Sequence, residues 1–273
     1  MTDVDRPIFI LGPHRSGTTL VYKTLHYHPT ITAFDRHVRA FRRCLWLAPV
    51  ARKWLGRNKP LESQRVWDEH ARDEDDHLGA ANATPSVVAH YRRLVSTTVR
   101  QRGATRFVAK YPRHSLRTEW IDAVFPDALF VHVARDWRAV VLSTLKRKVK
   151  REHGSGRWFG VRPVGWREWT ELPHDEAAVR TFAAVSRELE ARRERFGNRW
   201  LTVRYDEICD APTEQFAALL HRLGVAHDSR FDERLARHGF RNFDDKWRTE
   251  LDADRVDELR AIDPDLLGRY EFC

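Results

Sequence analysis

The stretch that decides the fold lies near the N-terminus and reads PIFILGPHRSGTTLVYKTL over residues 7–25. Its first five residues are mostly apolar and predict a short buried strand. A turn bounded by Gly12 and Gly17 follows, and the residues after it have the pattern of an apolar helix. N–H groups at a helix start attract anions, and glycines let an anion approach the backbone closely. The segment therefore predicts a binding site for phosphate or a similar oxyanion rather than an ordinary surface turn.

One position separates this turn from the nucleoside triphosphate pattern G-x-x-x-x-G-K-[ST]. Gly12, Gly17 and Thr19 fit the pattern, but Thr18 occupies the position of the lysine. A triphosphate kinase needs this lysine to hold the β- and γ-phosphates. A turn that carries Arg15 instead suits a donor with less charge at the transferring centre. We therefore keep a P-loop kinase-like nucleotide-binding enzyme only as an alternative. An activity that depends on magnesium would identify such an enzyme.

The remaining strand signals are spread along the chain. Runs of β-branched and aromatic residues lie at residues 106–109, 129–134 and 200–205, with a weaker run at 30–34. Helical patterns separate these runs. Strands that alternate with helices are typical of an α/β protein with a parallel sheet, and this is the fold class that we predict.

Two helices are marked by apolar residues at helical spacing. We expect Thr213 to cap the first and Gly224 to end it. The second carries a stripe that we expect to face the core, formed by Val179, Phe182, Val185 and Leu189. Periodicity is lost between residues 146 and 169, where clustered glycines predict a long loop of the kind that often binds ligands.

The length and charge of the chain narrow its class. It has 273 residues, and 48 Lys plus Arg against 39 Asp plus Glu give a net charge of +9. No repeat, low-complexity tract or flexible linker interrupts it, so we expect a single domain over residues 1–273. The excess positive charge favours a polyanionic partner. The candidates are a nucleic acid, an anionic lipid and a small polyanionic ligand.

The cysteines and the apolar runs indicate the cellular compartment of the protein. Cys44, Cys209 and Cys273 are too few and too scattered for a disulfide framework, which favours a reducing compartment. The first apolar run, residues 8–11, is far shorter than a membrane span, and no secretory signal is recognisable. We therefore expect a soluble cytoplasmic protein.

Several segments, taken in order with the turn, resemble one family. The turn contains RSGTTL at residues 15–20, and the other matching segments are residues 28–29, 125–128, 131–143, 203–208 and 246–248. Together they resemble the sulfotransferases that use 3′-phosphoadenosine 5′-phosphosulfate (PAPS), in particular the bacterial and tyrosyl-protein branches. The resemblance implies a P-loop-type three-layer fold with a central parallel sheet flanked by helices. It also implies in-line transfer of a sulfuryl group from PAPS to an acceptor hydroxyl.

The same resemblance implies which residues bind the donor. The residues expected to hold the 5′-phosphosulfate are Arg15, Ser16, Gly17, Thr18 and Thr19. Arg135 and Ser143 are expected to hold the 3′-phosphate, Tyr205 to lie near the adenine, and Lys246 to add a phosphate contact. Arg15 is also expected to neutralise charge on the departing oxygen, because guanidinium binds such oxyanions at two points.

The acceptor hydroxyl must lose a proton, so a general base is needed. In the cytosolic branch of the family, a lysine is followed two residues later by a catalytic histidine. Lys110 matches the lysine and is expected on the sulfuryl oxygens or the leaving group, but Pro112 stands at the histidine position. The resemblance therefore points to branches with a carboxylate base. The candidates are Asp35, six residues after the His-Pro pair, and Glu74 in the acidic run.

Metal and acceptor are the last predictions from the sequence. We expect no metal, because adjacent acids such as residues 73–76 do not all face one ion unless they form a loop. The acceptor is left open among a glycan or lipid head group, a small metabolite and a protein tyrosine, in that order. Residues 158–169 offer aromatic and cationic groups suited to sugars or lipids. The basic run at residues 146–151 supports a nucleic-acid-binding protein as a second alternative. An anionic acceptor would also explain that run, and the oligomeric state is not predicted.

Overall fold

The centre of the molecule is a five-stranded parallel sheet with the strand order β2-β3-β1-β4-β5. The computed structural model describes residues 5–41, 44, 47–55, 60–70, 75–149, 158 and 160–272. The strands are β1 (Ile8–Leu11), β2 (Ile31–Thr32), β3 (Arg106–Lys110), β4 (Leu129–Ala134) and β5 (Trp200–Arg204). The predicted α/β class is therefore confirmed. The weak run at residues 30–34 shortens to two residues at the sheet edge, where β2 has a single neighbour.

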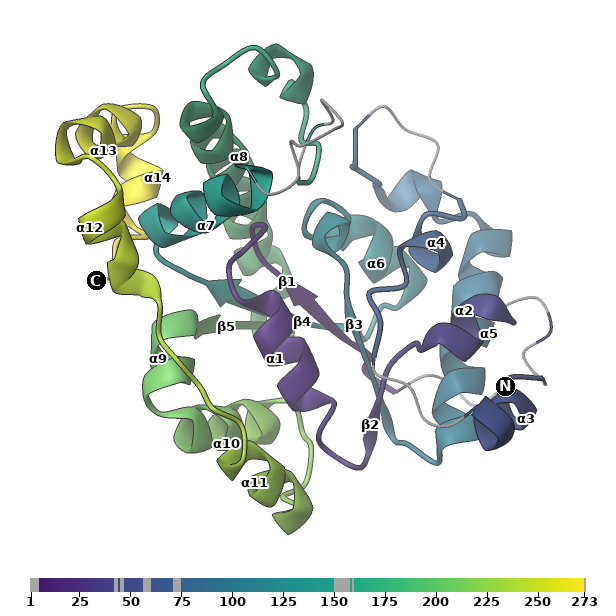
Figure 1. Cartoon of the computed structure of the whole chain (residues 1–273). Helices are drawn as coiled ribbons and strands as arrows, with labels where there is room; N and C mark the ends of the chain where they lie inside the picture. Colours follow the sequence, from purple (N-terminus) through teal and green to yellow (C-terminus); the bar gives the residue numbers. More distant parts are fainter. Residues whose placement is uncertain are drawn as a thin grey trace.

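Helices cover both faces of the sheet (Figure 1). One face is covered by helices α4 (Gln64–Trp67), α5 (Pro85–Arg102), α6 (Thr118–Val124) and α8 (His174–Phe196). The other is covered by α1 (Thr18–Leu25), α9 (Tyr205–Asp210), α10 (Pro212–Arg222) and α11 (Ser229–Ala236). The remaining helices are α2 (Arg36–Ala40), α3 (Leu47–Leu55), α7 (Trp137–Val149), α12 (Trp247–Glu250), α13 (Ala253–Arg260) and α14 (Pro264–Gly268). This is the three-layer arrangement expected from the resemblance.

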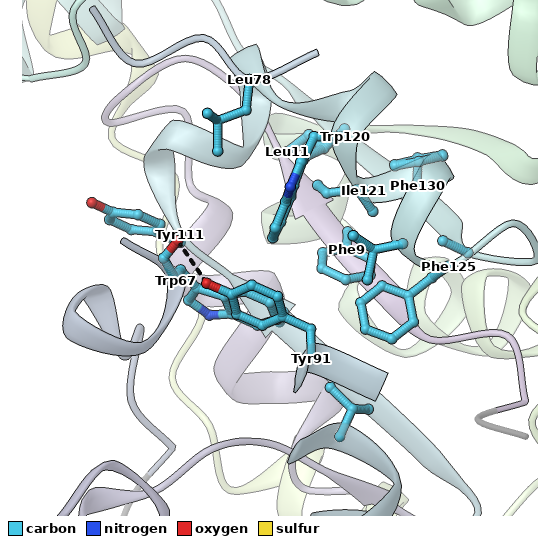
Figure 2. Close-up of a cluster of buried hydrophobic side chains, with 14 of the residues drawn as sticks. Phe9, Leu11, Trp67, Leu78, Tyr91, Tyr111, Trp120, Ile121, Phe125 and Phe130 are labelled. Carbon is cyan, nitrogen blue, oxygen red and sulfur yellow. Dashed lines mark hydrogen bonds between the residues drawn. The ribbon is translucent and has the colours of Figure 1, made fainter. Parts of the chain in front are cut away.

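Alternation along the strands sends side chains into two separate cores. In β1, Phe9 and Leu11 join one cluster, whereas Ile8 and Ile10 join the other. Figure 2 shows the first cluster, in which Phe9 lies among aromatic side chains such as Trp67. Because both faces are covered, the strand is apolar throughout instead of alternating with polar residues. A third cluster joins α7 and α8 to α13 and α14.

Several helix boundaries differ from the prediction. Helix α10 begins at Pro212 with Ala211 at the cap position, so Thr213 lies inside the helix. Proline is favoured at the first helical position because its fixed φ suits the helix and its missing N–H is not needed there. The helix does end as predicted, with Gly224 in the left-handed conformation at φ 65°. Within the expected loop, α7 extends to Val149 and a short 3-10 helix, η3 (Trp166–Trp169), is present.

The apolar stripe predicted on the second helix is confirmed. Val179, Phe182, Val185 and Leu189 all lie on α8 and are buried, with at most 2% of the side chain exposed. Because α8 reaches two of the core clusters, it fixes α7 against the sheet.

Candidate active site

The turn after β1 needs both of its glycines. Gly12 has φ 152°, and a Cβ there would lie 2.5 Å from Ser16 Oγ and 2.8 Å from the Val133 carbonyl oxygen. Gly17 has φ 94°, and a Cβ there would overlap the Tyr205 ring. A side chain at either position would therefore meet both backbone strain and neighbouring atoms. Gly17 is also the N-cap of α1, so the turn leads directly into the helix start.

Ser115 braces this turn from a neighbouring segment. It lies in the 3-10 helix η2 (Pro112–Leu116), which follows β3. The Gly12 N–H donates to Ser115 Oγ at 3.0 Å, and that hydroxyl donates to the Gly12 carbonyl oxygen at 3.0 Å. Sequence reasoning missed Ser115, because no local pattern links it to a glycine 103 positions away.

A cavity of about 760 Å³ opens above this turn, where the carboxyl ends of the parallel strands meet. The predicted site residues that line it are Arg15, Gly17, Thr18, Thr19, Lys110, Arg135, Ser143, Tyr205 and Lys246. They come from the turn, from the ends of β3 and β4, and from α7, α9 and the C-terminal segment. Ser16 lies behind the turn, fully buried, and its N–H donates to the Pro13 carbonyl oxygen at 3.1 Å. The structure thus gathers residues that are up to 231 positions apart between Arg15 and Lys246 into one cavity.

Arg135 contacts Arg15, Asp244 and Tyr205. It follows β4, and its Nη1 donates to the Arg15 carbonyl oxygen at 2.8 Å while its Nε donates to Asp244 Oδ1 at 2.7 Å. Its guanidinium carbon also lies 4.0 Å from the centre of the Tyr205 ring. These contacts hold a buried cation in one orientation next to the turn.

Arg15 and Ser143 meet above Arg135. The Arg15 Nε donates to Ser143 Oγ at 3.0 Å, so the turn and α7 are joined through a charged side chain. The pKa of Arg15 is lowered by burial, and further by the nearby charges of Arg135 and Arg147. Crowded cations of this kind favour the binding of an anion, which relieves their mutual repulsion.

Asp244 is the partner of Arg135, and sequence reasoning did not find it. It begins the 3-10 helix η5 (Asp244–Lys246) and is 1% exposed. Burial raises the pKa of Asp244, and the charge of Arg135 opposes that shift. The same segment brings Lys246 to the cavity, where its Nζ lies 4.7 Å from the Phe243 ring centre.

Lys110 is paired with a second carboxylate that the sequence did not reveal, that of Glu62. The Lys110 Nζ lies 2.5 Å from Glu62 Oε1, and both residues line the cavity. The pKa of Lys110 is lowered by burial, whereas the charge of Glu62 acts in the opposite direction. Glu62 lies in an irregular segment without a motif, so no sequence signal marks it.

Asp35 does not line the cavity. Its Oδ1 accepts the Val38 N–H at 2.9 Å, which caps α2, and its carboxylate forms an ion pair with Arg102 on α5. The side chain is 2% exposed. These contacts give Asp35 a structural role that ties the end of β2 to α5.

Glu74 lies outside the residues that the structure describes. Its neighbour Asp76 is fully buried and accepts hydrogen bonds from the backbone and side chain of Arg162 at 2.8 Å. Trp158 donates its ring N–H to the Val161 carbonyl oxygen at 2.8 Å. Arg162 therefore ties part of the aromatic and cationic segment to Asp76.

The comparisons place the chain in a family. A model described as "Sulfotransferase family" matches residues 7–229. The chain belongs to the sulfotransferase family. This confirms the resemblance predicted from the turn and the later motifs.

Relatives in this family are distant in sequence. The omega-hydroxy-beta-dihydromenaquinone-9 sulfotransferase of Mycobacterium tuberculosis is 23% identical over an alignment of 275 positions that covers 86% of this chain. This chain spans 66% of that relative's length. A protein-tyrosine sulfotransferase of Drosophila melanogaster is 30% identical over 142 residues, covering 52% of this chain and 26% of its own length.

Solved sulfotransferases share the fold. A sulfotransferase from Mycobacterium avium matches with a TM-score of 0.64 and 18% identity, covering 99% of this chain and 78% of its own. A sulfotransferase domain from the curacin biosynthetic pathway matches with a TM-score of 0.56 and 15% identity, covering 95% of this chain and 98% of its own. The three-layer sulfotransferase fold is therefore confirmed by structures as well as by sequence.

Among the helices of the described residues, none has both the length and the apolar character needed to cross a membrane. Within the same part of the chain, no three histidine, cysteine or acidic side chains are grouped as a metal site requires.

Proposed function

We propose that this protein transfers a sulfuryl group from PAPS to the hydroxyl group of an acceptor. The observation that carries the proposal is the convergence, in one cavity, of two elements whose charges and donors suit anions. One is the glycine turn with Arg15 at the start of α1, and the other is Arg135 with Ser143. PAPS has anionic groups at two positions of its ribose, and the family membership of the chain supports this donor.

The donor fits the charges of the cavity. The free N–H groups at the start of α1 and the guanidinium of Arg15 suit the 5′-phosphosulfate. Arg135 and Ser143 suit the 3′-phosphate, and Tyr205 and Lys246 line the same space. The Ser16 N–H already donates to Pro13, so the turn would contribute the N–H groups of its neighbours.

The chemistry requires an in-line displacement at sulfur. The acceptor oxygen forms a bond to sulfur while the bond from sulfur to the bridging oxygen breaks, which releases adenosine 3′,5′-bisphosphate. Negative charge develops on the departing oxygen, and positioned cations stabilise it. Arg15 and Lys110 are the cations that we assign to this role.

We infer that Glu62 takes the proton of the acceptor hydroxyl. Among the described residues that line the cavity, it is the one carboxylate, and it contacts the lysine assigned to the sulfuryl group. When Lys110 turns to the donor, Glu62 is left free to accept a proton. Asp35 and Glu74 stay predictions from the sequence, but the cap and ion pair of Asp35 argue for a different role.

The acceptor is proposed as a hydroxyl-bearing molecule, and its class is open among a glycan, a lipid, a small metabolite and a protein tyrosine. The mycobacterial relative is named for a hydroxylated menaquinone derivative and the Drosophila relative for protein tyrosine. Both names describe hydroxyl acceptors, which supports the proposed reaction. We also propose that no metal takes part and that the protein is cytoplasmic, which its sparse, scattered cysteines favour.

The decisive experiment supplies labelled PAPS and fractionated acceptor extracts to the wild type and to Arg15→Ala. We expect the wild type to label an acceptor without added magnesium and Arg15→Ala to lose this activity. ATP with magnesium serves as the control donor. Transfer from ATP, or no binding of adenosine 3′,5′-bisphosphate to the wild type, would refute the proposal.

A further inference from the structure

Helix α3 presents two large apolar side chains to solvent. Val50 is 51% exposed and Trp54 is 80% exposed, and they are two of the four large apolar residues that are exposed in the described part of the chain. They are four positions apart on one helix, so their side chains lie on the same face, one turn apart. The other two, Val164 and Phe243, lie in separate segments, and Phe243 lines the cavity. Val50 and Trp54 therefore form an apolar patch outside the cavity lining, here called the α3 patch.

The α3 patch is held on the outside of the domain. The opposite face of α3 is turned inward at Ala48, which is fully buried, and the helix packs against α2. Helix α2 is in turn fixed by the Asp35 cap and by the ion pair of Asp35 with Arg102 on α5. Figure 1 shows α3 at the edge of the molecule beside α2. The apolar pair is therefore presented outward by a helix that is packed on its other side.

The sequence around the α3 patch is strongly basic. Residues 36–61 contain eight Lys and Arg and no Asp or Glu, although the whole chain has 39 acidic residues against 48 basic ones. This segment alone therefore carries +8 of the net charge of +9. Lys53, next to Trp54 on α3, is exposed. The excess charge of the protein is thus concentrated in the segment that also presents the apolar pair.

A lipid bilayer surface matches both properties of this segment. Tryptophan is favoured at the boundary between membrane and water, because its ring is largely apolar and its N–H is polar. Helices that lie in this boundary bury an apolar face there, while their Lys and Arg residues attract anionic headgroups. A nucleic acid would match the charge but offers no apolar layer for Val50 and Trp54. The combination therefore favours an anionic membrane surface over the other polyanions that the excess charge allows.

We propose that the α3 patch docks the protein on the surface of an anionic lipid bilayer. Trp54 and Val50 enter the boundary between headgroups and acyl chains, and the basic residues of the same segment meet the headgroups. This is binding to one face of the membrane by a helix that lies in its plane. It goes beyond the transfer reaction and does not depend on it, because the α3 patch contributes no residue to the cavity.

The test is co-sedimentation of the full chain with vesicles of equal parts phosphatidylserine and phosphatidylcholine, and with vesicles of phosphatidylcholine alone. We expect the wild type to bind the anionic vesicles more tightly. Trp54→Ala should weaken this binding about tenfold or more, because the indole no longer enters the boundary. Lys53→Ala should weaken it about fivefold, the value of one basic residue at an anionic surface. Lys23→Ala is the matched control, because Lys23 is exposed on α1, outside the basic segment, and its loss should change the binding less than about twofold.

Four results would overturn the inference. The wild type could stay in solution with both kinds of vesicle, or bind both equally. Trp54→Ala could bind the anionic vesicles as tightly as the wild type, which would place the lipid on a different surface. Equal losses in Lys53→Ala and Lys23→Ala would show a general charge effect. A wild-type dimer that Trp54→Ala dissociates, measured by ultracentrifugation without vesicles, would show that the α3 patch joins two copies of the chain. Because Trp54 is 80% exposed, its variant should keep the wild-type stability in urea, so a loss of binding is not a loss of fold.

Discussion

Two ion pairs lie at the cavity, Lys110 with Glu62 and Arg135 with Asp244, and they differ in what their carboxylates can do. Glu62 is 36% exposed and lines the cavity next to Lys110. Asp244 is 1% exposed and lies behind Arg135, outside the cavity lining. A carboxylate open to the cavity can exchange its partner and accept a proton, whereas a buried one holds its partner in place. We infer that one pair serves the chemistry and the other serves the geometry of donor binding.

The strongest test of this comparison is Glu62→Gln. Removing a general base should lower kcat by about 10²–10⁴-fold, while the affinity for adenosine 3′,5′-bisphosphate changes little. Single-turnover transfer and calorimetry measure the two effects. Asp35→Asn and Glu74→Gln are the controls for the carboxylates predicted from the sequence.

Asp35→Asn should instead reduce stability, because it weakens the cap of α2 and the ion pair with Arg102. The kcat of its folded fraction should stay close to that of the wild type. If Glu62→Gln keeps the wild-type kcat and either control loses it, the assignment of the base to Glu62 is wrong.

Asp244→Asn should act on stability. It leaves Arg135 buried without its counter-ion, and removing one partner of a buried pair costs about 3–5 kcal/mol. Urea unfolding should show this loss, and adenosine 3′,5′-bisphosphate should restore part of it by supplying a substitute anion. Glu62→Gln should cost less, because water reaches Glu62. Equal losses in the two variants would remove the distinction between the pairs.

Arg135→Ala should act on donor recognition. We expect the affinity for adenosine 3′,5′-bisphosphate to fall by about 1.5–3 kcal/mol, the value of a charge-assisted hydrogen bond. The affinity for adenosine 5′-monophosphate should be nearly unchanged. Equal affinity of the wild type for the two nucleotides would contradict the assignment of Arg135 to the 3′-phosphate.

The smallest expected effect is on the pH dependence of stability. It comes from a histidine in the core and not from either ion pair. Burial lowers the pKa of His132, in β4, to about 4. Below pH 6.5 the unfolded chain therefore binds a proton that the native state does not, and stability falls as pH falls. Between pH 7 and 5.5 this histidine alone should cost about 1 kcal/mol.

His132→Gln should reduce the fall in stability between pH 7 and 5.5 by that amount, as measured by urea unfolding at several pH values. An unchanged slope in His132→Gln would show that other groups, the ion pairs among them, carry the acid response.

The turn, the sheet and the buried helix stripe were predictable because their signals are local. A strand, two glycines and a helix start lie within about 20 residues, and each β-branched run encodes one strand. Arg135 and Ser143 came from family resemblance, since their spacing alone indicates no site. The cap at Thr213 was mispredicted because Pro212, one position earlier, is a stronger helix start.

The sequence by itself determined the α/β class, the glycine turn before α1 and the family of this protein. Only the tertiary structure decided which acidic and hydroxyl side chains lie beside the basic residues of the cavity. Glu62 reaches Lys110 across 48 positions, and Asp244 reaches Arg135 across 109. Asp35 has the chemistry of a base but is used to cap a helix. The physical reason is that a carboxylate's role depends on its partners and its exposure, and these arise only when distant strand ends meet at one edge of the sheet.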